Sequence, residues 1–323
     1  YPGWDLILDT LPDGTAADPQ NPESYYRSTQ HGIARARQAG KPFCFNLNIS
    51  DPHKPFYNED GKPEVNKPSR VYTPAEITVP GFLPDDPKVR AELALYYSTV
   101  RRGDDSLGAI FRALQESGED ARTLIIFLSD HGMPLPFAKT QLYFHSTRTP
   151  LMIRWPGVTP AGSVNKSLVA NVDLAQTFLD MAGVPAPADM QGRSLRPVLA
   201  GQAPADWRKE FYYHYYEYPE PHHVSPHYGV ITADHKLVHY YGVGKDAVDL
   251  FDTAKDPLEL KSVAGQPDYA AIQADLEARL KRLRAELQVP DVDDPDATGE
   301  RTHRERQAKG AKNAAKKKAE GAK

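Results

Sequence analysis

Residues 123–157 constrain the fold of this chain more than any other stretch. Residues 123–128 form an apolar, β-rich run that is too short for a typical helix, so it predicts a buried strand of a parallel sheet. Asp130 and His131 follow the strand directly, and Lys139 comes after a proline-rich loop. Because ligands of open α/β folds bind at the carboxyl edge of the sheet, we expect a functional site here.

The elements before this strand fit an α/β order. Asn21 is a good helix cap, so we predict a helix over residues 21–39 that ends at Gly40. Residues 42–50 alternate apolar and polar side chains, which predicts a strand that ends next to His53. A long helix is expected over residues 86–118, with Gly103 as a candidate break. A strand, a long surface loop, a helix and a second strand follow one another in this order, which predicts a right-handed crossover between parallel strands.

Later elements have clear signals as well. A second strand is expected at residues 150–155 and an amphipathic helix at residues 172–181. From residue 210 the chain becomes aromatic and alternating, with a hairpin turn expected near Asp234 and a helix over residues 268–287. We therefore predict three parts: a catalytic domain (1–209), an α+β subdomain with an antiparallel sheet (210–290) and a disordered, acidic then basic tail (291–323).

Composition narrows the function classes. A formal net charge of −4 gives no overall attraction to nucleic acid, although the basic tail is a candidate polyanion contact that is more often simply solvated. Cys44 is the single cysteine, so an internal disulfide is excluded. No apolar run approaches 18 residues, so no transmembrane segment is expected. The chain starts at Tyr1 without a signal peptide, and we expect it to begin inside a larger protein.

Each candidate site residue also has an ordinary structural interpretation. Asp130 could cap a turn, Lys139 could be a solvated surface lysine, and His53 could bind the backbone of its own loop. His145 is as compatible with the surface as with a substrate contact. His227 and its neighbouring histidines have a spacing that fits no zinc pattern, so they favour an aromatic strand with exposed histidines.

Several motifs in order resemble the sulfatases of the alkaline-phosphatase-like superfamily. These motifs are SDHG at residues 129–132 with Lys139 and LYFHSTRTPLMIRWPG after it, DPHKPF at 51–56, VDLAQTFLDMAGVPAPADMQGRSLRPVLAG at 172–201, HKLVHYYG at 235–242 and DLFDTAKDPLE at 249–259. Within this family the chain is most similar to heparan sulfamidases and bacterial carbohydrate sulfatases. The resemblance implies an α/β sandwich with a mostly parallel central sheet flanked by helices, present here in part.

The resemblance also assigns roles to residues. It implies that Asp130 and His131 bind a metal ion, usually Ca²⁺, with Mg²⁺ or Mn²⁺ as alternatives. It implies that Lys139 contacts the sulfate and that His53 touches the sulfate or protonates the leaving group. We keep His145 and His227 as substrate-binding candidates. His131 stands where the sulfamidases have Asn, and Lys139 where they have Arg, which leaves the individual substrate open.

Two parts of the family's site have no match in the sequence. The resemblance implies a formylglycine nucleophile, made from Cys or Ser in a Cys/Ser-x-Pro/Ala-x-Arg motif, and a further Asp-Asp pair near the amino terminus. Cys44 fails the motif, and Lys67-Pro68-Ser69-Arg70 carries only its end. We therefore expect the nucleophile from an upstream segment and expect this chain alone to be inactive.

Three functional hypotheses remain open. The first is an enzyme that hydrolyses sulfate esters or sulfamates of sugars, with N- or O-sulfated glucosamine of heparan-type glycans as the substrate class. The second is a phosphodiesterase or phosphonate hydrolase of the same superfamily, and the third is an inactive glycan-binding relic. The family resemblance implies a periplasmic, secreted or lysosome-like location and a sulfated sugar as partner. Oligomeric state is not predicted.

Overall fold

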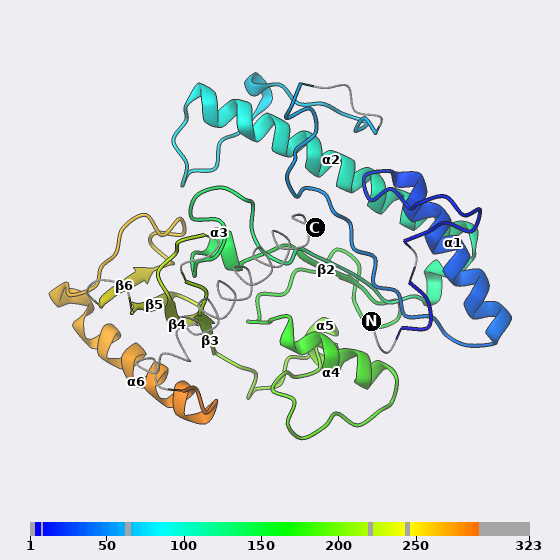
Figure 1. Ribbon diagram of the computed structural model, residues 1–323. Coiled ribbons are helices and arrows are strands. Elements are labelled where there is room, and N and C mark those ends of the chain that lie inside the picture. Colours follow the sequence, from blue (N-terminus) through cyan, green and yellow to red (C-terminus); the bar gives the residue numbers. More distant parts are fainter. Residues whose placement is uncertain (1–3, 8, 62–65, 219–221, 243–245, 291–323) are drawn as a thin grey trace, which may run out of the picture. The chain divides into compact units, whose positions relative to one another are not determined.

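The computed structural model describes residues 4–7, 9–61, 66–218, 222–242 and 246–290 (Figure 1). The chain divides into two compact units between Ile125 and Ile126, and each unit has its own hydrophobic core. The expected tail lies outside the described residues, and the division into three parts at residues 209 and 290 stays a prediction. Among the helices that the structure describes, none combines the length and apolar character needed to cross a bilayer.

The first unit is built on two helices that lie side by side, α1 (Pro22–Ala39) and α2 (Pro87–Glu116) (Figure 1). The predicted boundaries of α1 are confirmed. The Asn21 side chain accepts a hydrogen bond from the Glu23 amide at 2.9 Å, and Gly40 ends the helix with a φ of 64°. Ile33 of α1 and Ile110 and Leu114 of α2 form the centre of this core.

The strand predicted at residues 42–50 is wrong. Every second side chain of this segment is partly buried, and Phe43, Phe45, Leu47 and Ile49 pack against the α1–α2 core. The alternation therefore identified the packed face correctly. A strand also needs a neighbour for its backbone N–H and C=O groups, and within the described residues no strand pairs with this segment.

Helix α2 runs without a break through Gly103, contrary to the break considered from the sequence. A Cβ atom at Gly103 would lie 3.4 Å from the Cβ atom and carbonyl oxygen of Asp51, so the glycine lets a loop approach the helix closely. The buried face of α2 is partly polar. It includes Ser98, Thr99 and Arg102, whereas Phe111 is 38% exposed. Short 3₁₀ turns, η1 (Pro74–Glu76) and η2 (Asp120–Arg122), lie before and after α2.

Strand β1 (Ile125–Leu128) begins at the boundary of the two units and pairs with β2 (Leu151–Arg154) in a two-stranded sheet. A single turn of helix, α3 (Phe144–Thr147), lies between them in the chain, and α4 (Val172–Met181) and α5 (Arg196–Leu199) follow. Both strands and the α4 helix lie where the sequence predicts them. Leu195, Val198 and Trp207 form a small core beside α4 and α5.

The chain then forms a four-stranded antiparallel sheet in sequential order. Its strands are β3 (Glu210–Tyr215), β4 (His227–Thr232), β5 (His235–Tyr240) and β6 (Ala247–Asp252). Helix α6 (Ala270–Glu286), which follows the turn η3 (Pro267–Tyr269), covers one face of the sheet (Figure 1). Leu276 and Leu280 of α6 pack on Val230, Leu237 and Leu250. The predicted hairpin, sheet and helix are confirmed.

Candidate functional site

Asp130 and His131 follow β1 directly, as the sequence predicts. The Asp130 side chain is 83% exposed and that of His131 is 36% exposed. Asp130 Oδ1 accepts a hydrogen bond from the His131 amide at 3.0 Å, and Asp130 Oδ2 lies 3.3 Å from His131 Nε2. His131 Nδ1 lies 2.8 Å from the Gly132 carbonyl oxygen, so Nδ1 donates to that oxygen.

The pair is too small to hold calcium alone. Ca²⁺ takes about six to eight oxygen ligands, and Asp130 with His131 supplies one carboxylate and one imidazole. Across the residues that the structure describes, no group of three or more His, Cys, Asp or Glu side chains could hold a metal ion. These residues therefore do not fit a bound calcium ion by themselves, and the metal role of Asp130 and His131 stays a prediction.

Residues 129–147 form one cross-linked segment that carries four of the predicted site residues. The Gly132 amide donates to the Ser146 carbonyl at 3.2 Å, and the Gln141 amide donates to Ser146 Oγ at 3.3 Å. A Cβ atom at Gly132 would lie 2.0 Å from the His145 carbonyl oxygen and 2.2 Å from that of Ala138. Only glycine fits there, so the structure brings the Asp130–His131 pair next to the backbone of the Lys139 and His145 regions.

Lys139 occupies a constrained turn of this segment. Phe137 and Thr140, on either side, have φ angles of 66° and 63°, a conformation that non-glycine residues keep only when their surroundings hold it. Lys139 is half-buried, and none of the described residues provides an ion-pair partner for its ammonium group. A half-buried cation without a carboxylate partner is suited to an anionic ligand such as sulfate.

His145 lies at the other end of the segment, in α3. Its ring stacks on Tyr143 with 5.4 Å between the ring centroids and an interplanar angle of 7°. Burial lowers the pKa of His145 to about 4, and the positive charge of Lys236 acts in the same direction. The ring is therefore neutral near pH 7 and carries no charge for a sulfate.

His227 is fully buried in β4, with an exposed fraction of 0%. Its ring lies between Tyr215 and Tyr240, with both centroid distances 5.4 Å, and Nδ1 lies 2.8 Å from the Ser225 carbonyl oxygen. Nε2 has no hydrogen-bond partner among the described residues. Burial lowers the pKa of His227. The residue belongs to the aromatic face of the sheet, and its role as a substrate contact stays a prediction.

His53 belongs to the first unit and is exposed. Its Nδ1 lies 2.6 Å from the Lys54 carbonyl oxygen and donates to it, so Nε2 takes no part in this hydrogen bond. Lys54 is held by Glu92 at 2.6 Å and Glu59 at 3.3 Å. His53 thus binds the backbone of its own loop, and its role as a proton donor or sulfate contact stays a prediction.

Sequence reasoning missed the residue that anchors this loop. Arg102 of α2 forms a bidentate ion pair with Asp51, at 2.7 and 3.0 Å, and both side chains are 1% exposed. Asp51 lies two residues before His53, so the pair ties the histidine loop to the helix. The available signal was an arginine on a face of the helix that otherwise carries small and polar residues. The sequence did not show which residue pairs with this arginine.

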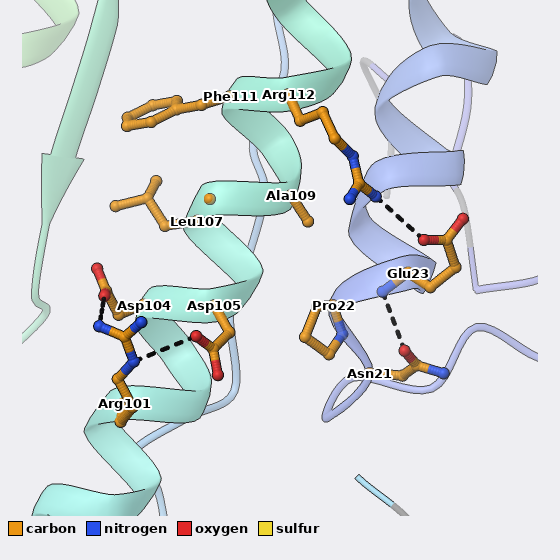
Figure 2. Close-up of a pocket in the computed structure, with 11 residues that line it drawn as sticks. Asn21, Pro22, Glu23, Arg101, Asp104, Asp105, Leu107, Ala109, Phe111 and Arg112 are labelled. Carbon is orange, nitrogen blue, oxygen red and sulfur yellow. Dashed lines mark hydrogen bonds and ion pairs between the residues drawn. The ribbon is translucent and has the colours of Figure 1, made fainter. Parts of the chain in front are cut away.

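An open groove in the first unit lies between α2 and the start of α1 (Figure 2). Its charged side chains neutralise one another: Arg112 pairs with Glu23 at 3.2 Å, and Arg101 pairs with Asp104 at 2.9 Å (Figure 2). None of the predicted site residues lines this groove. Its hollow shape alone gives no reason to place the chemistry there.

Known proteins resemble the chain over most of its length. The family model described as sulfatase matches residues 12–184, and the one described as N-sulphoglucosamine sulphohydrolase, C-terminal, matches residues 130–286. An N-acetylglucosamine-6-O-sulfatase from Bacteroides thetaiotaomicron is 41% identical over 207 residues, which cover 62% of this chain and 37% of that protein. Human N-sulphoglucosamine sulphohydrolase is 28% identical over 80% of this chain and 64% of its own length.

A solved structure described as a complex with its substrate D-glucosamine-2-N,6-O-disulfate is also similar. It shares 40% identity and a TM-score of 0.60 over 64% of this chain and 42% of that chain. The α/β, alkaline-phosphatase-like fold expected from the sequence is confirmed by this likeness. The chain spans less than two thirds of the length of the two curated relatives above.

Proposed function

Because the chain belongs to the sulfatase family, we propose that the whole protein hydrolyses sulfate esters or sulfamates on sugars, with N- or O-sulfated glucosamine as the substrate class. The observation that carries the proposal is the 41% identity to a protein named N-acetylglucosamine-6-O-sulfatase, together with the 40% identity to a structure described as bound to a glucosamine disulfate. Both similarities cover more than 60% of this chain.

Lys139 is the proposed sulfate contact. Its ammonium group is half-buried and has no carboxylate partner among the described residues, so it can pair with a sulfate oxygen at little cost. A fixed cation beside the sulfuryl oxygens holds and orients the sulfate for attack, whereas the negative charge that develops on the leaving oxygen calls for a proton donor. His53 is the proposed proton donor, through Nε2, because its Nδ1 is already engaged by the Lys54 carbonyl.

Sulfatases generally use a metal ion and a formylglycine. We propose that Asp130 and His131 contribute to a Ca²⁺ site in the whole protein, with Mg²⁺ or Mn²⁺ as alternatives, although the two donors do not fit the ion by themselves. The formylglycine is proposed to come from outside these 323 residues, since Cys44 lies outside the family's motif. What the residues of this chain do is bind the sulfate, orient it and supply the proton.

His145 and His227 are proposed sugar contacts of unequal kind. His145 is partly exposed and neutral, which suits a hydrogen bond to a sugar hydroxyl. His227 is fully buried between Tyr215 and Tyr240, so it can reach a sugar only if one of these rings moves. We also propose that the protein acts outside the cytoplasm, in a periplasmic, secreted or lysosome-like compartment, as the family resemblance implies.

The test is sulfate release by the full-length protein with bound metal. Candidate substrates are glucosamine 6-O-sulfate, glucosamine N-sulfate and D-glucosamine-2-N,6-O-disulfate, with an aryl phosphodiester and a phosphonate monoester as comparators. We expect release from at least one glucosamine sulfate to exceed hydrolysis of both phosphorus compounds. Faster phosphodiester or phosphonate hydrolysis supports the rival enzyme class. Sulfated-glycan binding without any hydrolysis supports the inactive relic, and either result overturns the proposal.

A further inference from the structure

A fully buried ion pair lies beneath the segment that carries Lys139. Lys236 of β5 and Glu259, in the turn after β6, both have side-chain exposures of 0% and contact each other directly. Burial lowers the pKa of Lys236 to about 8, and the Glu259 carboxylate opposes that effect, so the lysine is charged near neutral pH. The two residues belong to HKLVHYYG and DLFDTAKDPLE, motifs to which the proposed function assigns no role.

The remaining contacts of the pair go to one short piece of backbone. Lys236 Nζ donates a hydrogen bond to the Leu142 carbonyl and lies 3.8 Å from the centroid of the Phe144 ring. Glu259 accepts a hydrogen bond from the Phe144 amide. The Lys236 ammonium thus binds the Leu142 carbonyl, and the Glu259 carboxylate binds the Phe144 amide. A neighbouring β-strand would bind these two backbone groups in a similar way.

Side-chain packing reinforces this attachment. A Cβ atom at Gly229 of β4 would lie 2.6 Å from Leu142 Cδ2, so the absence of a side chain on the strand makes room for Leu142. Tyr143 packs against Phe251 of β6 with 5.7 Å between ring centroids. These contacts hold residues 142–144 in one position against the antiparallel sheet. Lys139 lies three residues before Leu142 in the chain.

Burying two charges is costly, and a buried pair by itself is weak support for stability. It does impose geometry, because each charge must keep its partner. Here the constraint reaches residues 129–147, whose internal contacts join Gly132 to Ser146 and to Ala138. Fixing residues 142–144 therefore fixes the turn that presents Lys139.

We propose that Lys236 and Glu259 are positioning residues for the sulfate-binding segment, acting through the Leu142 carbonyl and the Phe144 amide to set the place of Lys139. The inference rests on the proposed function for its catalytic consequence. The structural part, that the pair holds residues 138–147 in place, stands on contacts within the second unit alone.

The first measurement requires no activity. Amide hydrogen exchange on this chain should rise at residues 138–147 in Glu259→Ala, and less in Glu259→Gln, which keeps an oxygen for the Phe144 amide. Arg208→Met is the matched control, because it breaks another largely buried ion pair of this unit, Arg208 with Asp173. The Asp173 carboxylate also accepts hydrogen bonds from the Ala170 and Arg193 amides, which lie outside residues 138–147. The control should leave exchange at residues 138–147 unchanged. Equal exchange at these residues in the parent and in both Glu259 variants overturns the structural part.

The second measurement is kcat/KM for sulfate release by the full-length protein. Misplacing a substrate contact by about 1 Å costs on the order of 100-fold, so we expect Glu259→Ala to lower kcat/KM by roughly 10- to 100-fold and Glu259→Gln by much less. In a Lys139→Ala background, Glu259→Ala should have almost no further effect, because it acts through Lys139. Fully additive losses, or equal losses in the Ala and Gln variants, overturn the positioning role. If the parent releases no sulfate, the proposed function and the catalytic part of this proposal fail. The exchange result still decides whether Lys236 and Glu259 hold residues 138–147 in place.

Discussion

The buried pair between Arg102 and Asp51 allows a quantitative stability prediction. Replacing Arg102 with Met keeps an unbranched apolar stem but leaves the Asp51 carboxylate, 1% exposed, without its two guanidinium hydrogen bonds. Removing one partner of a buried pair costs about 3–5 kcal/mol. A domain has only about 5–15 kcal/mol of total stability, so Arg102→Met should remove a large part of it.

The assay is urea unfolding of the chain, with hydrogen exchange at the α2 amides to report on the first unit. Arg112→Met is the matched control on the same helix, since Arg112 and Glu23 are 53% and 54% exposed. An exposed pair contributes about 0–1 kcal/mol. The double variant Asp51→Asn/Arg102→Met should lose less unfolding free energy than the two single variants lose together, because it removes both charges of the pair. A loss below about 1 kcal/mol for Arg102→Met, or strict additivity, would refute the reasoning.

Three further predictions follow from the second unit and α2. Burial lowers the pKa of His145 and of His214 to about 4. As pH drops, the unfolded chain therefore protonates these histidines before the folded chain does, and the free energy of unfolding falls between about pH 6.5 and pH 4. His214→Gln should flatten a urea-unfolding pH profile in that window by up to about 3 kcal/mol, and an unchanged profile contradicts the assignment. Gly132→Ala should lower the unfolding free energy by more than about 2 kcal/mol, since its Cβ meets two backbone oxygens, whereas Gly108→Ala, with nothing within 4 Å, should raise it by about 0.5–1 kcal/mol. Equal effects at the two glycines would contradict this account. Tyr215→Leu should raise the exposure of His227 to a histidine-directed label, and no change in labelling argues against a shielding role for Tyr215.

Local signals were sufficient for the elements that end in a recognisable cap or turn. Asn21 and Gly40 define both ends of α1, and the hairpin turn near Asp234 sets the register of β4 and β5. The order of residues around Asp130 and Lys139 likewise placed both on one segment after β1. These features depend on neighbours in the sequence, which is why a single sequence reveals them.

Features that depend on a distant partner could not be predicted. Residues 42–50 have the alternation of a strand, but pairing depends on a neighbour that the alternation does not specify. Arg102 and Asp51 are 51 residues apart in the chain, and Lys236 and Leu142 are 94 residues apart. No periodicity links such residues, although a lysine inside an apolar alternating strand such as β5 is a signal that a buried partner exists.

The central claim is that Lys139 binds the sulfate group of a sulfated glucosamine for hydrolysis. The most direct measurement is the rate of sulfate release from D-glucosamine-2-N,6-O-disulfate by the full-length protein and its Lys139→Ala variant, with exchange profiles to show that both are folded. We predict release by the parent and a loss of at least about 100-fold in kcat/KM for Lys139→Ala, the size seen when one transition-state contact is removed. Release at the same rate by both proteins, or by neither, would contradict the account.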